Sequence, residues 1–415
     1  MYAPLRKGNI PPSGDGTASP AFLLPGSPAF RRANLALFCA GFSTFSLLYC
    51  VQPLLPVFSS DFAISPALSS MSLSCTTFFL ALAILAVGLR AEGFSRKRLM
   101  ACSLLVSSVL TLIAACLPDW TSMLLIRSLL GIALGGVPAV AMAYLAEEMH
   151  PEGLGLAMGL YIGGTAFGGM AGRFITGLVV DFFSWRIAMG TIGMLGLLSA
   201  GLFVLMLPPS SQFTPRAGSS LKLARAAFVA HLRDPRLLGV FALGFLLMGS
   251  FVTTYNYVGY RLLAHPYDLS QSWVGAIFLV YLVGIVASAW FGRLADRHGR
   301  LNMLTLAIAL MLGGALLTLA RPLPIIIAGI MLLTFGFFAG HSVASGSVGR
   351  YATHAKALAA SLYLLAYYLG SSVMGSAGGS VWSHAGWPGV IAFVALALCC
   401  GLLLCFCLRR MRQPT

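Results

Sequence analysis

Long apolar stretches, broken by short polar turns, make up most of the chain. Twelve of these stretches contain roughly 20 apolar residues each, the length that an α-helix needs to cross about 30 Å of hydrocarbon. The predicted spans are 35–58, 68–89, 99–117, 121–146, 155–180, 187–208, 237–260, 271–291, 301–320, 324–348, 358–380 and 387–407. The pattern predicts an all-α membrane protein.

The predicted spans divide the chain into two halves. We expect a flexible tail over 1–33, because it is rich in Pro, Gly and Ser and lacks the apolar core of a signal peptide. A first six-helix half over 34–208 is followed by a polar, basic connector, 209–236. A second six-helix half covers 237–408, and 409–415 form a short tail.

Composition supports a membrane protein and restricts its possible partners. Of the 415 residues 58% are hydrophobic and 9% charged, whereas soluble domains are about 45 to 50% apolar. The net charge of +15 comes from Lys and Arg that lie mainly on the side of the two termini. The bias follows the positive-inside rule, so we expect both termini in the cytoplasm and no nucleic-acid partner.

An internal repeat is visible in the polar turns. "GLRAEGFSRKRLM", which begins at Gly88, aligns with "GRLADRHGRLNML", which begins at Gly292, at an offset of 204 residues. "FCAGF" (38–42) recurs as "FALGF" (241–245) at an offset of 203, and Gly168 recurs as Gly370 at an offset of 202. Such offsets predict two parallel repeats of six helices.

The turn "GRLADRHGR" resembles the loop signature G-x-L-x-D-R-x-G-R of the major facilitator superfamily. "LLYCVQPLLP" (47–56) and "SLYLLAYYLGSS" (361–372) are similar to the bacterial inner-membrane YnfM-type transporters of the drug and sugar efflux branch. The resemblance implies the major facilitator fold of two pseudo-symmetric six-helix bundles. It also implies an inner-membrane secondary transporter that works by alternating access, with cavity-lining spans 1, 4, 7 and 10.

The resemblance assigns the two polar turns to a cytoplasmic latch between the halves. In such a turn glycine permits a tight reversal, and the acid can pair with an arginine. The first copy departs from the signature at Arg90 and Ser95, so its latch is expected to be weaker, and the basic residues can also serve topology alone. The latch residues are Gly88, Glu92, Arg96, Gly292, Asp296, Arg297, Gly299 and Arg300.

The fifth span contains "GTAFGGMAGR" (164–173), which resembles the antiporter signature GxxxGPxxGG. Gly164, Gly168 and Gly172 match it, while Gly169 replaces the proline and Arg173 replaces the last glycine. Small residues four apart also serve helix packing alone. Both the export-specific and the packing interpretation remain open.

Ionisable residues inside the bilayer are costly and often functional. Only Arg127, Arg173 and His341 lie within predicted spans, and no Asp or Glu does. Arg127 matches an arginine that the family often uses in proton coupling, or it bonds structurally to backbone carbonyls. His341 either titrates during transport or packs.

The remaining substrate-cavity candidates are polar and aromatic. Together with Arg127 and His341 they are Tyr49, Gln52, Tyr255, Asn256 and Tyr367. The absence of a membrane carboxylate favours an anionic or neutral polar substrate over a lipophilic cation. The resemblance to the efflux branch implies that the substrate is moved by proton-coupled efflux.

Other function classes are disfavoured. We find no HExxH, GxSxG or Walker sequence, so we expect neither an enzyme nor an ATP-driven pump. We also expect no metal and no cofactor, because the nine cysteines lie in apolar spans without metal-site spacing. The expected partners are a small molecule, protons and the lipid bilayer, with a monomer as the functional unit. A non-transporting membrane sensor or scaffold is the least favoured alternative.

Overall fold

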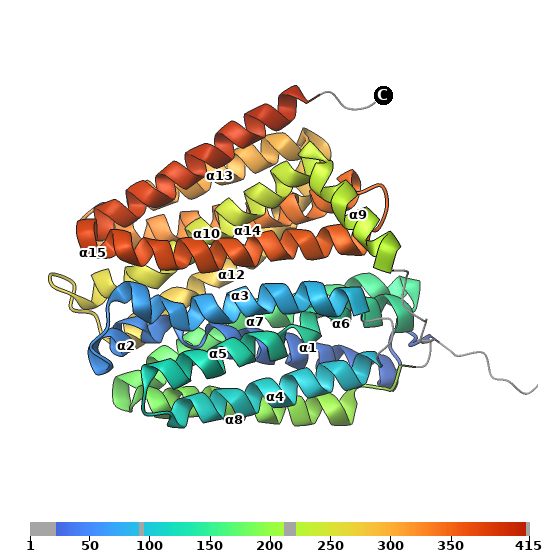
Figure 1. Ribbon diagram of the computed structural model, residues 1–415, viewed down its shortest axis with the longest axis horizontal. Coiled ribbons are helices and arrows are strands. Elements are labelled where there is room, and N and C mark those ends of the chain that lie inside the picture. Colours follow the sequence, from blue (N-terminus) through green and yellow to red (C-terminus); the bar gives the residue numbers. More distant parts are fainter. Residues whose placement is uncertain (1–21, 91–94, 211–220, 412–415) are drawn as a thin grey trace, which may run out of the picture.

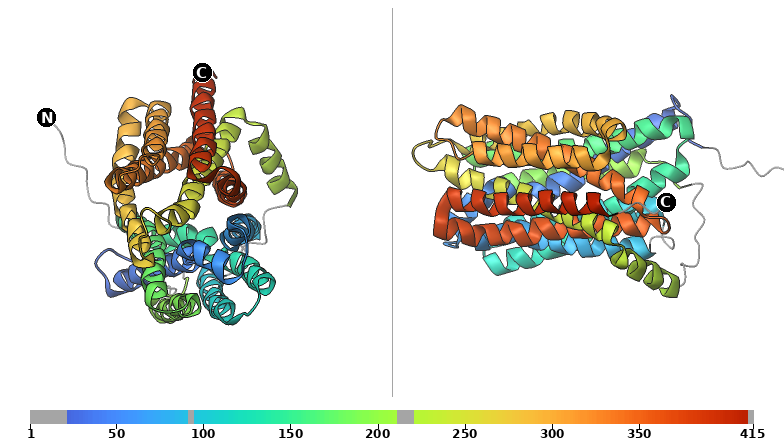
Figure 2. Two further views of the ribbon diagram at one scale, coloured as in Figure 1. Left: turned by 90° about the vertical axis from the view of Figure 1, so that its left-hand side faces the viewer. Right: turned by 90° about the horizontal axis from the view of Figure 1, so that it is seen from above.

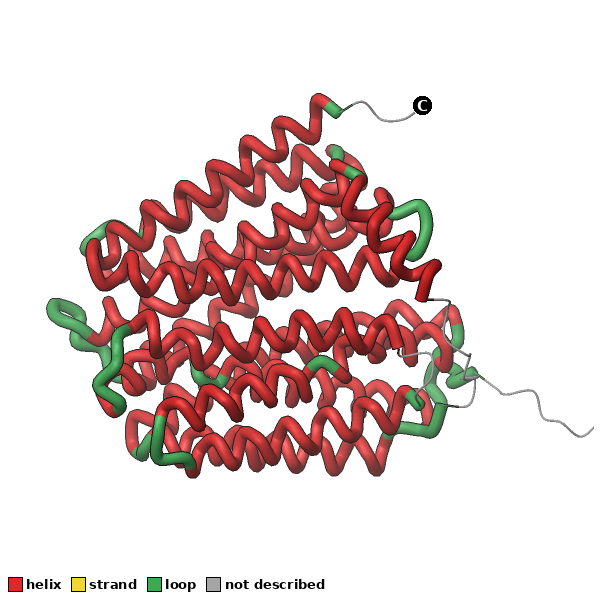
Figure 3. The backbone as a smooth tube through the Cα atoms, viewed as in Figure 1, coloured by secondary structure: helices red, strands yellow, loops and turns green. Residues whose placement is uncertain are grey.

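The fold is a long helical bundle, seen in a computed structural model that describes residues 22–90, 95–210 and 221–411 (Figure 1). The helices run nearly parallel, and the loops gather at the two ends of the bundle (Figure 3). Their bounds are α1 Pro28–Tyr49, η1 Gln52–Leu54, α2 Leu55–Asp61, α3 Pro66–Arg90, α4 Arg96–Cys116, α5 Trp120–Leu134, α6 Gly136–Glu148, α7 Pro151–Phe182, α8 Trp185–Met206, α9 Leu221–Arg233, α10 Pro235–Leu263, α11 Gln271–Ala276, η3 Ile277–Val280, α12 Tyr281–His298, α13 Arg300–Leu317, α14 Leu323–Tyr351 and α15 Lys356–Arg410.

Within the described residues, 11 helices are long and apolar enough to span a membrane. The 55-residue α15 contains two of the predicted spans, because Gly386 has non-helical angles (φ 58°, ψ −154°) and Pro388 follows it. A positive φ of this kind is accessible to glycine at little cost. With α15 divided at Gly386, the predicted all-α membrane fold is confirmed, and each predicted span has a helix.

The helices form two bundles, α1–α8 and α10–α15, which we call the first and the second half (Figures 1 and 2). Across the boundary α3 packs on α15, and α11 packs on α7. We call the end where α1 begins and α15 ends the terminal end, and the opposite end the distal end.

Two predicted boundaries differ from the helices. Helix α1 already begins at Pro28, capped by Ser27, so the boundary at residue 34 falls inside a helix. Residues 1–21 of the predicted tail lie outside the described residues. The predicted connector 209–236 contains the helix α9, which slants across the terminal end and contacts α10 and α15 (Figure 1).

Glycines let α1 and α7 approach one another closely. A Cβ on Gly168 would lie 2.2 Å from the carbonyl oxygen of Phe42, and Gly164 and Gly172 meet α1 in the same way. The second half repeats this contact, since a Cβ on Gly370 would lie 2.1 Å from the carbonyl oxygen of Phe245. Gly168 and Gly370 are the residues that the sequence repeat aligned, so the repeat is also present in the packing.

This packing predicts the effect of adding one methyl group. Gly168→Ala should destabilise the protein by about 1 to 3 kcal/mol, because the backbone of α1 blocks the space. Gly155→Ala, on the same helix with no atom within 4 Å of its Cβ position, is the matched control. Thermal unfolding in detergent should show a lower midpoint for the first variant only; equal midpoints would contradict the packing argument.

Candidate functional site

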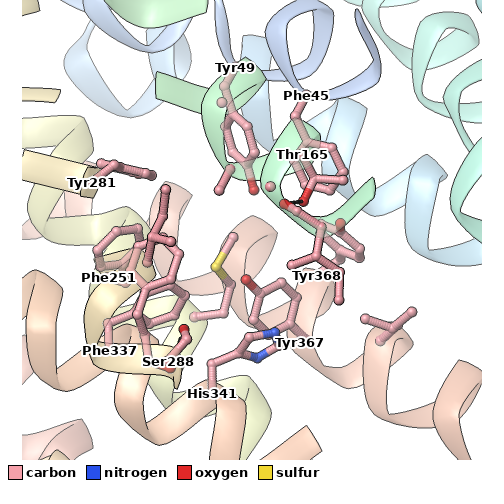
Figure 4. Close-up of a pocket in the computed structure, with 18 of the residues that line it drawn as sticks. Phe45, Tyr49, Thr165, Phe251, Tyr281, Ser288, Phe337, His341, Tyr367 and Tyr368 are labelled. Atoms are coloured by element: carbon pink, nitrogen blue, oxygen red, sulfur yellow. Dashed lines mark hydrogen bonds between the residues drawn. The ribbon is translucent and has the colours of Figure 1, made fainter. Parts of the chain in front are cut away.

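A cavity of about 410 Å³ lies between the two halves (Figure 4). Helices α1 and α7 of the first half and α10, α12, α14 and α15 of the second half line it. The lining residues are Phe45, Tyr49, Gly159, Ile162, Gly163, Thr165, Ala166, Gly169, Arg173, Met248, Phe251, Tyr281, Ile285, Ser288, Ala289, Phe337, Phe338, His341, Leu364, Tyr367 and Tyr368. Their character is mostly apolar and aromatic, with no carboxylate among them.

Arg173 is the charged residue of this lining, and it follows directly after Gly172 in the close α1–α7 contact. Its guanidinium Cζ lies 3.9 Å from the ring centre of Tyr49 and 4.9 Å from that of Tyr281. Its side chain donates from Nε to Gln52 Oε1 at 2.6 Å and from Nη1 to the Gly169 carbonyl at 2.6 Å. Nη2 has no hydrogen-bond acceptor among the described residues. The residue is 1% exposed.

No described carboxylate lies within 4 Å of Arg173. A buried cation without a counter-ion is unfavourable, because it has lost its hydration and gained only dipoles and ring faces in return. The cavity is therefore electropositive on the side of Arg173.

Gln52 and Asn256 lie just beyond the cavity rather than in its lining. Gln52 Nε2 donates to Asn256 Oδ1 at 2.7 Å, so these two buried amides connect η1 of the first half to α10 of the second. Asn256 Nδ2 has no partner among the described residues. The sequence predicted both residues for the cavity; the structure instead places them behind Arg173.

Of the predicted aromatic residues, some line the cavity and one lies outside its lining. Tyr49, Tyr367 and His341 line the cavity, with the rings of His341 and Tyr367 4.6 Å apart. His341 Nδ1 lies 2.9 Å from the hydroxyl oxygen of Tyr363, and the imidazole stacks on Phe337 (Figure 4). Tyr255 is outside the lining, where its hydroxyl bonds Thr334 Oγ1 at 2.7 Å.

Arg127 has a different environment from Arg173. It is 0% exposed in the core of the first half. Its nitrogens donate to the carbonyl oxygens of Ser72 at 2.9 Å, Leu47 at 3.1 Å and Leu48 at 2.8 Å. Arg127 is not in the cavity lining, so its contacts match the structural alternative that the sequence left open.

Some lining residues were not predicted. The resemblance indicated spans 1, 4, 7 and 10, yet no described residue of the fourth span, α5 and α6, is in the lining, while α7 and α12 contribute to it. In α12, Tyr281 and Ser288 face the cavity (Figure 4). Their spacing of seven residues places two polar side chains on one helical face of an apolar span, a signal that the sequence offered.

Among the described residues, the ion pairs of the predicted latch residues Arg96, Asp296 and Arg300 join partners within the same half. Arg96 pairs with Glu147 at 3.0 Å in the first half. Asp296 pairs with Arg300 at 3.0 Å and with Arg350 at 3.6 Å in the second. Gly299 has φ 87° at the turn between α12 and α13, as the glycine in this motif allows. Glu92 lies outside the described residues.

Contacts between the halves hold the distal end together. The glycines Gly177 of α7 and Gly275 of α11 pack backbone to backbone. Asp181 accepts hydrogen bonds from the backbone N–H groups of Gln271 and Ser272 at 3.2 and 3.3 Å. The cavity therefore lies on the terminal side of a closed distal interface.

This architecture, two six-helix bundles around a central cavity, is that of a membrane transporter. The family model described as Major Facilitator Superfamily matches residues 37–270 and 262–415. The chain belongs to the major facilitator superfamily, and it is a multi-pass membrane transporter.

Its relatives are similar over nearly their whole length. The Inner membrane transport protein YnfM of Escherichia coli is 47% identical, over 92% of this chain and 91% of that protein. The uncharacterized MFS-type transporter YybF of Bacillus subtilis is 46% identical, over 92% of this chain and 95% of that protein. These transporter relatives confirm the resemblance and the prediction that the chain is not an enzyme.

Solved transporters share the fold. A bacterial homolog of the human lysosomal transporter Spinster, inward-facing and unoccupied, has a TM-score of 0.74 at 15% identity, covering 93% of this chain and 98% of that one. A mutant of the nucleoside transporter NupG has a TM-score of 0.74 at 16% identity, covering 92% of this chain and 100% of that one. At these identities the likeness concerns the fold.

The contacts of Arg127 predict a structural role. Arg127→Lys should lower the free energy of unfolding by a few kcal/mol, because an ammonium cannot reach the three carbonyl oxygens that a planar guanidinium reaches together. Tyr367→Phe, whose hydroxyl has no described hydrogen bond, should unfold at the wild-type temperature. Thermal unfolding in detergent compares the two; wild-type stability of Arg127→Lys would show that these bonds contribute little.

Proposed function

We propose that this protein exports a small organic anion or neutral polar compound across the bacterial inner membrane by proton-coupled alternating access. The observation that carries the proposal is the guanidinium of Arg173, which is buried, has no described counter-ion and lines the cavity between the halves. The protein works as a monomer with both termini in the cytoplasm.

The charge of the cavity supports an anionic substrate. A cation would approach Arg173 against its field in a medium of low dielectric constant, whereas a carboxylate would pair with it. The unbonded Nη2 offers a donor for such an oxygen. A lipophilic-cation antiporter is disfavoured by the same argument, although the ring faces alone would suit a cation.

The apolar lining refines the kind of anion. Phe251 stacks on Phe337 at 3.8 Å between ring centres, and Tyr281 and Phe338 extend this aromatic wall. A polar headgroup held by Arg173 would leave the rest of the substrate among these rings, where burial of apolar surface is favourable. The arrangement therefore suits an aromatic carboxylate better than a multiply charged acid.

His341 is the proposed proton site. Imidazole is the side chain whose protonation changes near neutral pH, and His341 lies in the same cavity as Arg173. Proton-driven export requires the proton to enter after the substrate has left, so protonation of His341 would reset the empty cavity rather than tighten binding of the anion. Proton movement and substrate movement would then be coupled through one cavity.

The latch is proposed for the opposite conformation. The terminal end, which we assign to the cytoplasm, contains Asp296 with Arg300 and Arg350 within one half. When the distal end opens, the polar turns of the two halves would approach, and the acid could accept hydrogen bonds from the first half. Glu92, Arg96, Arg297 and the glycines Gly88 and Gly292 belong to the same proposed latch.

Removal of the cavity charge tests the substrate class. Arg173→Gln should weaken binding and counterflow of 1-naphthoate in proteoliposomes by about 10- to 100-fold, since a charge-assisted hydrogen bond contributes about 1.5 to 3 kcal/mol. Arg186→Gln, an exposed arginine at the distal end, is the control and should transport normally.

A permanently cationic dye is the second substrate in this assay. The anion proposal is wrong if wild-type protein moves the dye and ignores 1-naphthoate, which would favour the cation antiporter. A protein that moves neither compound nor any other solute in a counterflow screen would instead fit the sensor or scaffold alternative.

Proton coupling is tested at His341. His341→Gln should flatten the pH dependence of transport while exchange at fixed pH continues, because glutamine can bond to Tyr363 but does not titrate. His384→Gln, on an exposed face of α15, controls for a general histidine effect. A variant with the wild-type pH profile would assign His341 to packing.

A further inference from the structure

A continuous hydrogen-bonded bridge of three buried side chains crosses from one half to the other. Arg173 donates to Gln52 at 2.6 Å, and Gln52 donates to Asn256 at 2.7 Å. Each of the three is at most 2% exposed. The bridge begins at the cavity wall and lies between the cavity and the distal contacts of Gly177 with Gly275.

The bridge lies near the pseudo-symmetry axis of the fold. Gln52 and Asn256 are 204 residues apart, one more than the offset of 203 at which the first span repeats, so they occupy nearly equivalent positions in the two halves. At the offset of 202 found for the glycines, Arg173 corresponds to Gly375. Asn256 Nδ2 faces this glycine, 3.2 Å from its Cβ position, and has no partner there. The first half thus supplies the only charge of the bridge.

The guanidinium of Arg173 serves two interactions at once. It faces the cavity, and through Nε it donates to the side-chain oxygen Oε1 of Gln52. A carboxylate is a stronger acceptor than a neutral amide, because its full negative charge attracts the guanidinium strongly in a medium of low dielectric constant. A carboxylate that accepted from Nη2 with one oxygen and from Nε with the other would therefore compete with Gln52 for Arg173.

Resting on the proposed function, we propose that the Arg173–Gln52–Asn256 bridge is a distal gate that an anionic substrate releases. When the anion draws Arg173 away, Gln52 loses its donor and no longer holds a fixed position against Asn256. Buried amides inside a bilayer require partners, so the unbonded pair is destabilised and the halves separate at the distal end. Gln52 and Asn256 are positioning residues in this scheme and need not touch the substrate.

The test measures separation of the distal ends in the full-length protein in nanodiscs. Spin labels at Thr121→Cys and Ile325→Cys, two exposed positions near the distal ends of α5 and α14 in opposite halves, report the distance by double electron–electron resonance in a background with the native cysteines replaced. Gln52→Met and Asn256→Leu break the bridge while keeping Arg173. Thr254→Val is the matched control, because this buried hydroxyl bonds only within α10, to the Ser250 carbonyl.

Without ligand, both bridge variants should raise the distal-separated population about fivefold, the effect of one buried hydrogen bond of about 1 kcal/mol. Thr254→Val should match the wild type. Addition of 1-naphthoate should shift the wild type and Thr254→Val toward separation and leave both bridge variants almost unchanged, although they still bind the probe through Arg173. A purely structural bridge would not produce this loss of response.

The proposal is overturned if both bridge variants keep the wild-type distance distribution and the full response to 1-naphthoate. Because two bridge variants are tested, misfolding of one of them would not remove the test. Each variant is checked for a monodisperse elution profile. If the wild type does not bind 1-naphthoate, the proposed anion specificity is wrong, and so is the proposal that an anion releases the gate. The ligand-free comparison with Thr254→Val still decides whether the bridge holds the distal end closed.

Discussion

The close approach of α7 to α1 is the contact on which the arrangement of the site depends. Three glycines four residues apart remove the side chains that would separate the two helices, and backbone then meets backbone. Arg173 follows the last of them, so its long side chain starts at the helix contact and reaches both Tyr49 and Gln52. A wider spacing between these helices would place the guanidinium out of reach of η1, and the bridge to Asn256 could not form.

The two halves share their packing but not their chemistry. The contact of Gly168 with Phe42 recurs as that of Gly370 with Phe245, which shows that each repeat holds its first and fifth spans together in the same way. The two halves differ in chemistry at Arg173, because the equivalent residue of the second half is Gly375, which has no side chain. One half then provides the charge, and the other provides His341 and most of the aromatic wall. A substrate that touches both sides can therefore bias the arrangement of the halves.

The two arginines inside the membrane spans have different contacts, which their residue type alone could not reveal. Arg127 and Arg173 are both almost fully buried, and both lack a described carboxylate partner. Arg127 directs its donors to three backbone carbonyls within one half, which satisfies the guanidinium locally. Arg173 directs one donor across to Gln52 and lies in the cavity wall. The first stabilises a bundle, and the second connects the cavity to the interface between bundles.

Hydrophobic length by itself determined the spans, because a helix in lipid satisfies its own backbone and needs only about 20 apolar residues. The repeat offsets likewise determined the two-half architecture, since duplicated packing residues keep their spacing. The assignment of Arg127 and Gln52 to the cavity depended on contacts between helices far apart in the sequence, and here the tertiary structure decided. Tyr281 entered the site, and Arg127 was placed outside the cavity lining, because the rotation and depth of each span are set by its neighbours and not by its own hydrophobicity.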